Sequence, residues 1–118
     1  MNSTIKELVK VFSTLKDNWD KDGAKGISAE VVNFTLFLID TLTEEHLLIF
    51  DAAPGHNGEI MLDIRENEKS LELITYPDKK IAVKMSSIGI YSQSNFDESD
   101  LPQLLQWLRI SDYWTDHN

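Results

Sequence analysis

The chain lacks cysteine altogether and is poor in basic side chains, with 11 Lys and Arg against 20 Asp and Glu among 118 residues. The absence of cysteine excludes disulfides and thiolate metal sites. The net charge of −9 is spread along the chain, and no cluster of Lys and Arg is present that would follow a phosphate backbone. We therefore expect no nucleic-acid partner and no binding to anionic membranes, whereas a basic protein partner stays open.

Long apolar runs are missing as well. Charged residues interrupt the apolar ones at the N-terminus, which argues against a signal peptide. The longest apolar stretch, residues 31–42, contains Asn33 and Asp40 and is too short to span a bilayer. Because 42% of the residues are nevertheless hydrophobic, we expect a single domain over residues 1–118, located in the cytoplasm.

Apolar residues at helical spacing mark both ends of the chain. The spacing predicts helices over residues 4–17 and 29–43, and Ser28 is a natural N-cap for the second helix. Asp100 begins a capping-box pattern, which predicts a C-terminal helix through about Ile110.

In the middle of the chain apolar and polar side chains alternate, which is typical of strands with one buried face. Polar turns separate the segments, and residues 51–58 and 92–99 are expected to be loops. The strand candidates are Leu47–Phe50, Ile60–Ile64, Leu71–Tyr76, Ile81–Met85 and, as a continuation or a separate edge strand, Ile88–Tyr91. We predict an α+β domain with two N-terminal helices, an antiparallel meander sheet of three to five strands and a C-terminal helix, the helices on one face of the sheet.

The same alternation indicates which face of the sheet is buried. The apolar face is expected to consist of Ile60, Leu62, Ile64, Leu71, Leu73, Ile81, Val83 and Met85. Because Met61 and Ile74 interrupt the alternation, the opposite parity stays open for some strands.

The segment Leu15–Ser28 connects the two N-terminal helices and contains one Trp, three Asp and two Gly. Asn18, Asp20, Asp22 and Gly23 fit the first, third, fifth and sixth positions of an EF-hand calcium loop. The twelfth position, which needs a bidentate Glu, is Ala29. The pattern therefore favours a structural loop over a calcium site.

In this structural interpretation Asn18 and Asp20 form side-chain turns, Gly23 supplies a positive φ and Ser28 caps a helix. Trp19 is expected to be a packed anchor in the core. Its replacement by Ala would then destabilise the fold by about 3 kcal/mol or more, because a large cavity would remain.

No catalytic constellation is recognisable, and we expect no catalytic residue and no cofactor. His56 lies in a turn between Asp51 and Glu59, and a His with two carboxylates is a minimal metal or acid–base site. Histidines in exposed turns are common, so these three residues are only weak candidates for a metal site.

The segment resembles one in many small bacterial proteins of no settled activity, with the pattern Leu-x-x-Asn-Trp-Asp-Gly-x-Gly-Ala-x-x-Ile-Ser before an apolar helix. Lys21 stands where these proteins usually have Gly. The matching residues are Leu15, Asn18, Trp19, Asp20, Gly23, Ala24, Ile27 and Ser28, with Pro54 and Gly58 in a weaker second part. Because these proteins resemble accessory proteins of mobile elements and of toxin or defence loci, the resemblance implies an interaction protein rather than an enzyme.

These observations favour a non-catalytic protein-interaction module, such as an antitoxin-like or immunity-like neutraliser of a protein partner. Trp107, Tyr113 and Trp114 are candidate contact residues, although their pattern favours ordinary core packing slightly. Two alternatives stay open: a small metal-dependent hydrolase that uses the His56 region, and a small-molecule binding module with a cleft between helices and sheet.

Overall fold

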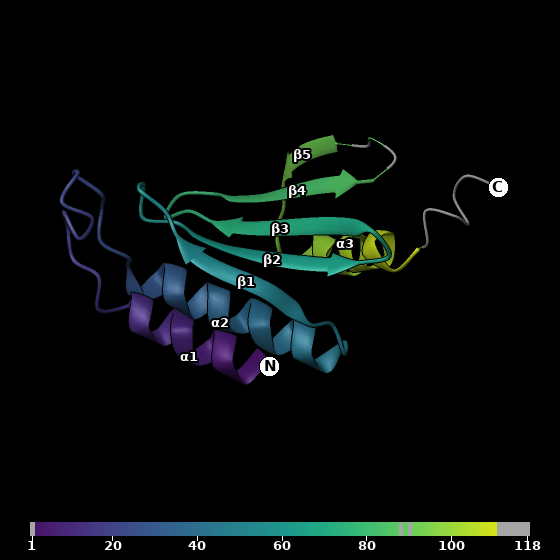
Figure 1. Cartoon of the computed structure of the whole chain (residues 1–118), viewed down its shortest axis with the longest axis horizontal. Coiled ribbons are helices and arrows are strands. Elements are labelled where there is room, and N and C mark those ends of the chain that lie inside the picture. The colour runs from purple at the N-terminus through teal and green to yellow at the C-terminus, as the bar shows by residue number, and fades with distance from the viewer. Residues whose placement is uncertain (1, 88, 90, 111–118) are drawn as a thin grey trace.

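The computed structural model describes residues 2–87, 89 and 91–110 and contains a five-stranded sheet with three α-helices (Figure 1). The strands follow one another through the sheet in sequence order, each antiparallel to the next. The elements are α1 (Asn2–Phe12), α2 (Ala29–Glu44), β1 (Ile49–Pro54), β2 (Ile60–Glu66), β3 (Lys69–Thr75), β4 (Lys80–Ser86), β5 (Tyr91–Asn95), the 3-10 helix η1 (Glu98–Asp100) and α3 (Leu101–Arg109). The predicted α+β meander is confirmed. Within the described ranges, no helix has the length and apolar character needed to cross a bilayer.

The core lies on the face of the sheet that the helices cover. Leu62 and Leu73 lie opposite each other in the register of β2 and β3, and neither has any exposed surface. They belong to one cluster with Leu38 of α2 and Leu108 of α3. Burial of each such side chain stabilises the fold by about 2 kcal/mol. In Figure 1, α1 and α2 lie on the β1 side of the sheet, and α3 lies behind β2 and β3.

On β4 the residues that face the helices have the parity opposite to the predicted one. Ala82 pairs with Leu73 and therefore lies on the helix-covered face. Lys80 lies on that face too, with its ammonium 4.4 Å from the ring centre of Phe34. A lysine stem can cover apolar surface while its charge stays near water. The face of β4 that the helices cover therefore has two lysines around an alanine, and this polar pattern is typical of an exposed face. Ile81, Val83 and Met85 lie on the other face of the sheet, where Ile81 and Val83 are still buried, at 9% and 7% exposed.

Two segments expected to be loops are strands at the edges of the sheet. β1 continues to Pro54, which is tolerated because an edge strand has no second neighbour to receive a hydrogen bond from this position. β5 covers Tyr91–Asn95, and all five of its residues are exposed, so polar side chains suit both of its faces. Ile88 and Ile90 of the predicted strand lie outside the described residues.

The ends of the helices differ from prediction where side chains compete with the backbone. α1 ends at Phe12 rather than at residue 17, because the Ser13 and Thr14 hydroxyls donate to carbonyls one turn back. The predicted cap of α2 is confirmed, since Ser28 Oγ accepts from Val31 N at 3.2 Å.

At the C-terminal helix the capping box is displaced by three residues. Asp97 accepts from Ser99 N at 2.9 Å, and its own N–H donates to Asp100 Oδ2 at 2.9 Å, so the box opens η1. Asp100 makes no side-chain cap bond to α3, which begins at Leu101 and ends at Arg109.

Candidate interaction surface

The loop of residues 13–28 is held together by its own polar side chains. Asp20 Oδ1 accepts from the backbone N–H groups of Asp22 at 2.9 Å and Ala24 at 3.0 Å. Asn18 Oδ1 accepts from Gly23 N at 2.8 Å. Asn18 and Gly23 have φ angles of 65° and 84°, in the left-handed region that these residue types tolerate best. The contacts of Asn18, Asp20 and Gly23 are thus those of turn residues.

Trp19 is half-buried in this loop and is not a member of the core cluster, which corrects the expectation of a core anchor. Its indole Nε1 donates to Lys25 O at 2.8 Å, so the ring bridges the two arms of the loop. At Gly26 a Cβ would lie 2.9 Å from Leu15 O, so the close approach of the two arms requires glycine there.

The loop docks on the turn between β1 and β2. Lys25 N donates to His56 O at 2.9 Å, and His56 Nδ1 lies 3.2 Å from Asp20 Oδ2. The pKa of Asp20 is lowered by the hydrogen bonds from Asp22 N and Ala24 N, with a smaller contribution from His56. Asp20 therefore stabilises both the loop and its contact with the turn.

His56 thus contacts Asp20 rather than the two carboxylates that flank it in the sequence. Asp51 is exposed on β1, and Glu59 Oε1 accepts from Asn57 N at 2.8 Å. Among the residues that the structure describes, no group of three or more His, Asp or Glu side chains is arranged to hold a metal ion. The observed contacts of His56 are those that dock the loop on the turn.

Of the three C-terminal aromatic residues proposed as contacts, Tyr113 and Trp114 lie outside the described residues. Trp107 is half-buried against the core. The Lys69 ammonium lies 4.7 Å from the centre of its ring and donates to Trp107 O at 2.9 Å. The positive charge at the last turn of α3 favours the helix dipole, so Lys69 and Trp107 together fix α3 on β3.

The outer edge of β1 is capped at its first residue, Ile49, by Asn2, a residue that the sequence did not single out. Its Nδ2 donates to Leu47 O at 2.8 Å and to Thr43 Oγ1 at 3.0 Å, while its Oδ1 accepts from Ile49 N at 2.9 Å. The side-chain amide thus takes the place of a neighbouring strand at Ile49. Because Asn2 is only 8% exposed, this contact is protected from water.

Beside this closed edge, Leu48 and Phe50 are 58% and 61% exposed. The register of β1 shifts at Phe50, as in a β-bulge. The Arg65 guanidinium lies over the Phe50 ring, 3.7 Å from its centre, and donates to Asp63 Oδ2 from Nε at 3.2 Å and from Nη2 at 3.0 Å. It is therefore held between an aromatic ring and a carboxylate. We call Leu48, Phe50 and Arg65 the Phe50 surface.

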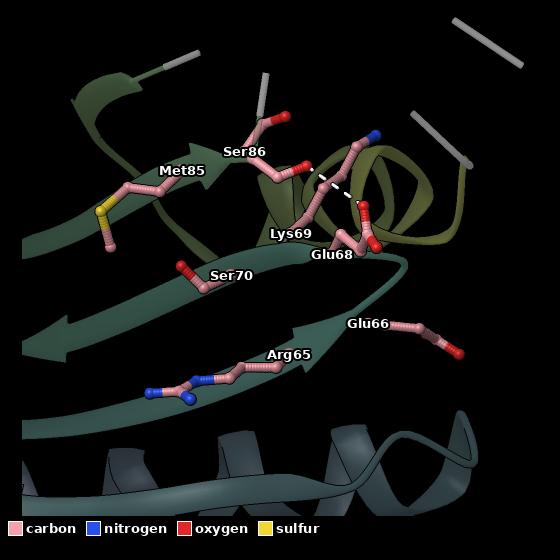
Figure 2. Close-up of a pocket in the computed structure, with 8 residues that line it drawn as sticks. Arg65, Glu66, Glu68, Lys69, Ser70, Met85 and Ser86 are labelled. Carbon is pink, nitrogen blue, oxygen red and sulfur yellow. Dashed lines mark hydrogen bonds between the residues drawn. The ribbon is translucent and has the colours of Figure 1, made fainter. Parts of the chain in front are cut away.

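Arg65 separates two hollows of different character. A mainly apolar groove of about 560 Å³ lies between α1 and β1, lined by Thr4, Ile5, Leu48, Ile49, Phe50 and Arg65. A more charged hollow of about 490 Å³ lies over the ends of β2, β3 and β4 (Figure 2). There Glu68 accepts from Ser87 Oγ at 3.3 Å, and Glu66 and Lys69 are among the other lining residues. The Phe50 surface thus borders a groove beside α1 on one side and a hollow with several charged lining residues on the other.

The sequence pattern did not reveal this surface, because Leu48 and Phe50 stand in an apolar run that predicts a buried strand. The only local signal is that Leu47 and Ile49 alternate with them, so one pair must face away from the core. Comparison with known proteins finds no matching protein family, no matching curated protein and no matching solved structure.

Proposed function

We propose that the chain is a non-catalytic protein-interaction module, antitoxin-like or immunity-like, that binds a basic protein through the Phe50 surface. One observation carries the proposal: two large apolar side chains are exposed beside an arginine that is already fixed in position. Arginine and aromatic residues contribute most to the affinity of protein interfaces. Since Phe50 and Asp63 already orient Arg65, its ordering on binding costs little conformational entropy.

The charge around the Phe50 surface supports a basic partner. Asp51 is exposed next to Phe50, and Glu66 and Glu68 follow Arg65 at the β2–β3 turn. The chain as a whole carries a charge of −9. An apolar centre with an acidic rim gives affinity through the centre, while the rim steers a partner of opposite charge. We expect such a complex to weaken as the salt concentration rises.

Leu48→Lys tests this proposal against a closely matched control. Leu48 and Val11 are both 58% exposed, but Val11 lies near the C-terminal end of α1, outside the lining of either hollow beside Arg65. Lysine at residue 11 is compatible with the end of a helix. Each variant and the parent are immobilised and exposed to a lysate of the source cells, and bound proteins are identified and then purified for titration.

We expect the parent and Val11→Lys to retain the same basic protein in stoichiometric amount and Leu48→Lys to lose it. The dissociation constant of the purified pair should rise at least tenfold for Leu48→Lys. If no variant retains a protein, or if Leu48→Lys binds as tightly as Val11→Lys, the proposal is wrong.

A second candidate function is the binding of an apolar small molecule in the groove between α1 and β1. The groove volume of about 560 Å³ is in the range of ligand sites, and Thr4 and Arg65 are its polar lining residues. Native mass spectrometry of the chain isolated from its source cells separates this candidate from protein binding. A retained compound adds a constant small mass that is present in Val11→Lys and absent in Leu48→Lys.

A further inference from the structure

The outer edge of β5 carries backbone groups that point away from the sheet. β5 pairs with β4 on one side, and no other described strand pairs with it. Phe96 N donates to Lys80 O at 3.0 Å, which fixes the alternation of the ladder. Residues of β5 with the same parity as Phe96 therefore bond to β4. The N–H and C=O groups of the others, Tyr91, Gln93 and Asn95, face outwards.

Apart from the shortness of the strand, the described residues place none of the usual protections against strand pairing at this edge. The sequence Tyr91–Asn95 contains no charged residue and no proline, and its register with β4 is regular over all five pairs. Natural sheets protect open edges with charges, prolines, bulges or covering segments. In a chain with a net charge of −9, an uncharged strand at an open edge is a place where another strand can approach without close charge repulsion.

We propose that β5 pairs with β5 of a second copy of this chain, antiparallel and about a two-fold axis at Gln93. In this register Gln93 lies opposite Gln93 of the second copy, and Tyr91 lies opposite its Asn95. These are the residues whose backbone groups face outwards, so every pair among them exchanges two hydrogen bonds. The result is a continuous sheet through both copies.

The sequence of β5 itself favours a second copy as the occupant. Ser92 and Ser94 lie symmetrically about Gln93, so the antiparallel pairing places serine opposite serine and glutamine opposite glutamine. A two-fold interface requires this kind of self-complementarity. A strand of five residues buries less surface than a standard interface, so we expect a dissociation constant of roughly micromolar to millimolar.

The salt dependence of this dimer should be opposite to that of the proposed complex with a basic protein. Two copies that each carry a charge of −9 repel each other at long range. Added salt screens this repulsion, so dimerisation should become stronger at higher ionic strength. The two interfaces are also separate, because the Phe50 surface lies at β1 and β2, at the opposite side of the sheet from β5 (Figure 1).

A charge-exchange experiment tests the register. Gln93→Lys places two lysines opposite each other at the two-fold axis, and Gln93→Glu does the same with two glutamates. Gln106→Lys, at an exposed glutamine of α3, is the matched control. Sedimentation equilibrium of the full chain over a wide concentration range gives the dissociation constant of each variant and of the mixture of Gln93→Lys with Gln93→Glu.

We expect the parent and Gln106→Lys to dimerise equally, each Gln93 variant alone to dimerise at least tenfold more weakly, and the mixture to recover association. A parent that stays monomeric up to millimolar concentration would show that β5 does not self-pair. Equal dimerisation of Gln93→Lys and the parent, or a mixture that associates no better than its components, would exclude a two-fold axis at Gln93.

Discussion

The two edges of the sheet are built in opposite ways. At β1 the amide of Asn2 occupies the backbone groups of Leu47 and Ile49, and the register shifts at Phe50. At β5 the register is regular, the side chains are exposed and no described segment covers the outer backbone groups. Both edges belong to the same five-stranded sheet, so their difference comes from what is packed beside them.

This difference separates two kinds of recognition. The closed edge at β1 prevents strand pairing at Ile49 and presents side chains instead, with Phe50 and Arg65 held in place. The open edge at β5 presents backbone groups, which pair with any strand in the right register. We therefore expect side-chain substitutions to decide binding at β1, and strand register and charge to decide it at β5.

Among the substitutions that test the difference between the two edges, Asn2→Ala should have the largest effect on stability. It leaves the N–H of Ile49 and the carbonyl of Leu47 without their partner in a buried position, and we expect a loss of about 3 kcal/mol in the free energy of unfolding. Urea unfolding followed by circular dichroism measures it. Asn33→Ala, at an exposed asparagine of α2, is the control and should change stability little. A loss as small as that of the control would show that the edge is not closed by Asn2.

Trp19→Ala is expected to have a smaller effect, about 1 to 2 kcal/mol, because the ring is half-buried and makes one hydrogen bond across the loop. This value replaces the larger loss expected for a core anchor. Leu73→Ala, at a residue with no exposed surface, is the reference and should lose more stability in the same urea titration. Equal losses of stability for the two variants would show that Trp19 packs as tightly as a core residue.

Gln93→Lys should change the free energy of unfolding of the monomer by no more than about 0.5 kcal/mol, because the side chain is exposed at an open edge. The measurement is urea unfolding at a concentration at which the parent is monomeric. A loss comparable to that of Asn2→Ala would mean that the β5 edge is as closely packed as the β1 edge.

Acid should weaken the loop that docks on the turn between β1 and β2. The pKa of Asp20 is lowered, mainly by the N–H groups of Asp22 and Ala24. Its carboxylate therefore stabilises the folded state fully at a pH above the ordinary pKa of 3.8. This stabilisation is lost as the pH falls through the lowered pKa. Asp20→Asn should therefore flatten the acid limb of stability against pH, measured by urea unfolding of the variant and the parent.

Much of the fold follows from local patterns. The period-two stretches predict β2 and β3 with the observed buried rows, because Leu62 and Leu73 belong to apolar residues at every second position, although Met61 and Ile74 interrupt the polar row. The strand β5 and the end of β1 were missed because an exposed edge strand needs no apolar face, and so its sequence resembles that of a loop.

The candidate site was predicted less well than the fold. The turn roles of Asn18 and Asp20 depend on residues within six positions, and such contacts follow from residue type. The contact of Asp20 with His56 joins residues 36 positions apart, and the stacking of Arg65 on Phe50 depends on the pairing of two strands. No local spacing encodes either contact.

The sequence by itself determined the three helices, the central strands, their order and the turn chemistry around Asn18 and Asp20, because side-chain spacing and turn chemistry act over a few residues. Only the tertiary structure decided which face of β4 meets the helices, that Asn2 caps the start of β1 and that no described strand pairs with the outer edge of β5. The physical reason is that the backbone of a strand has two faces and two edges that are equally able to be covered or exposed. Which of them meets protein and which meets water depends on elements far away in the chain.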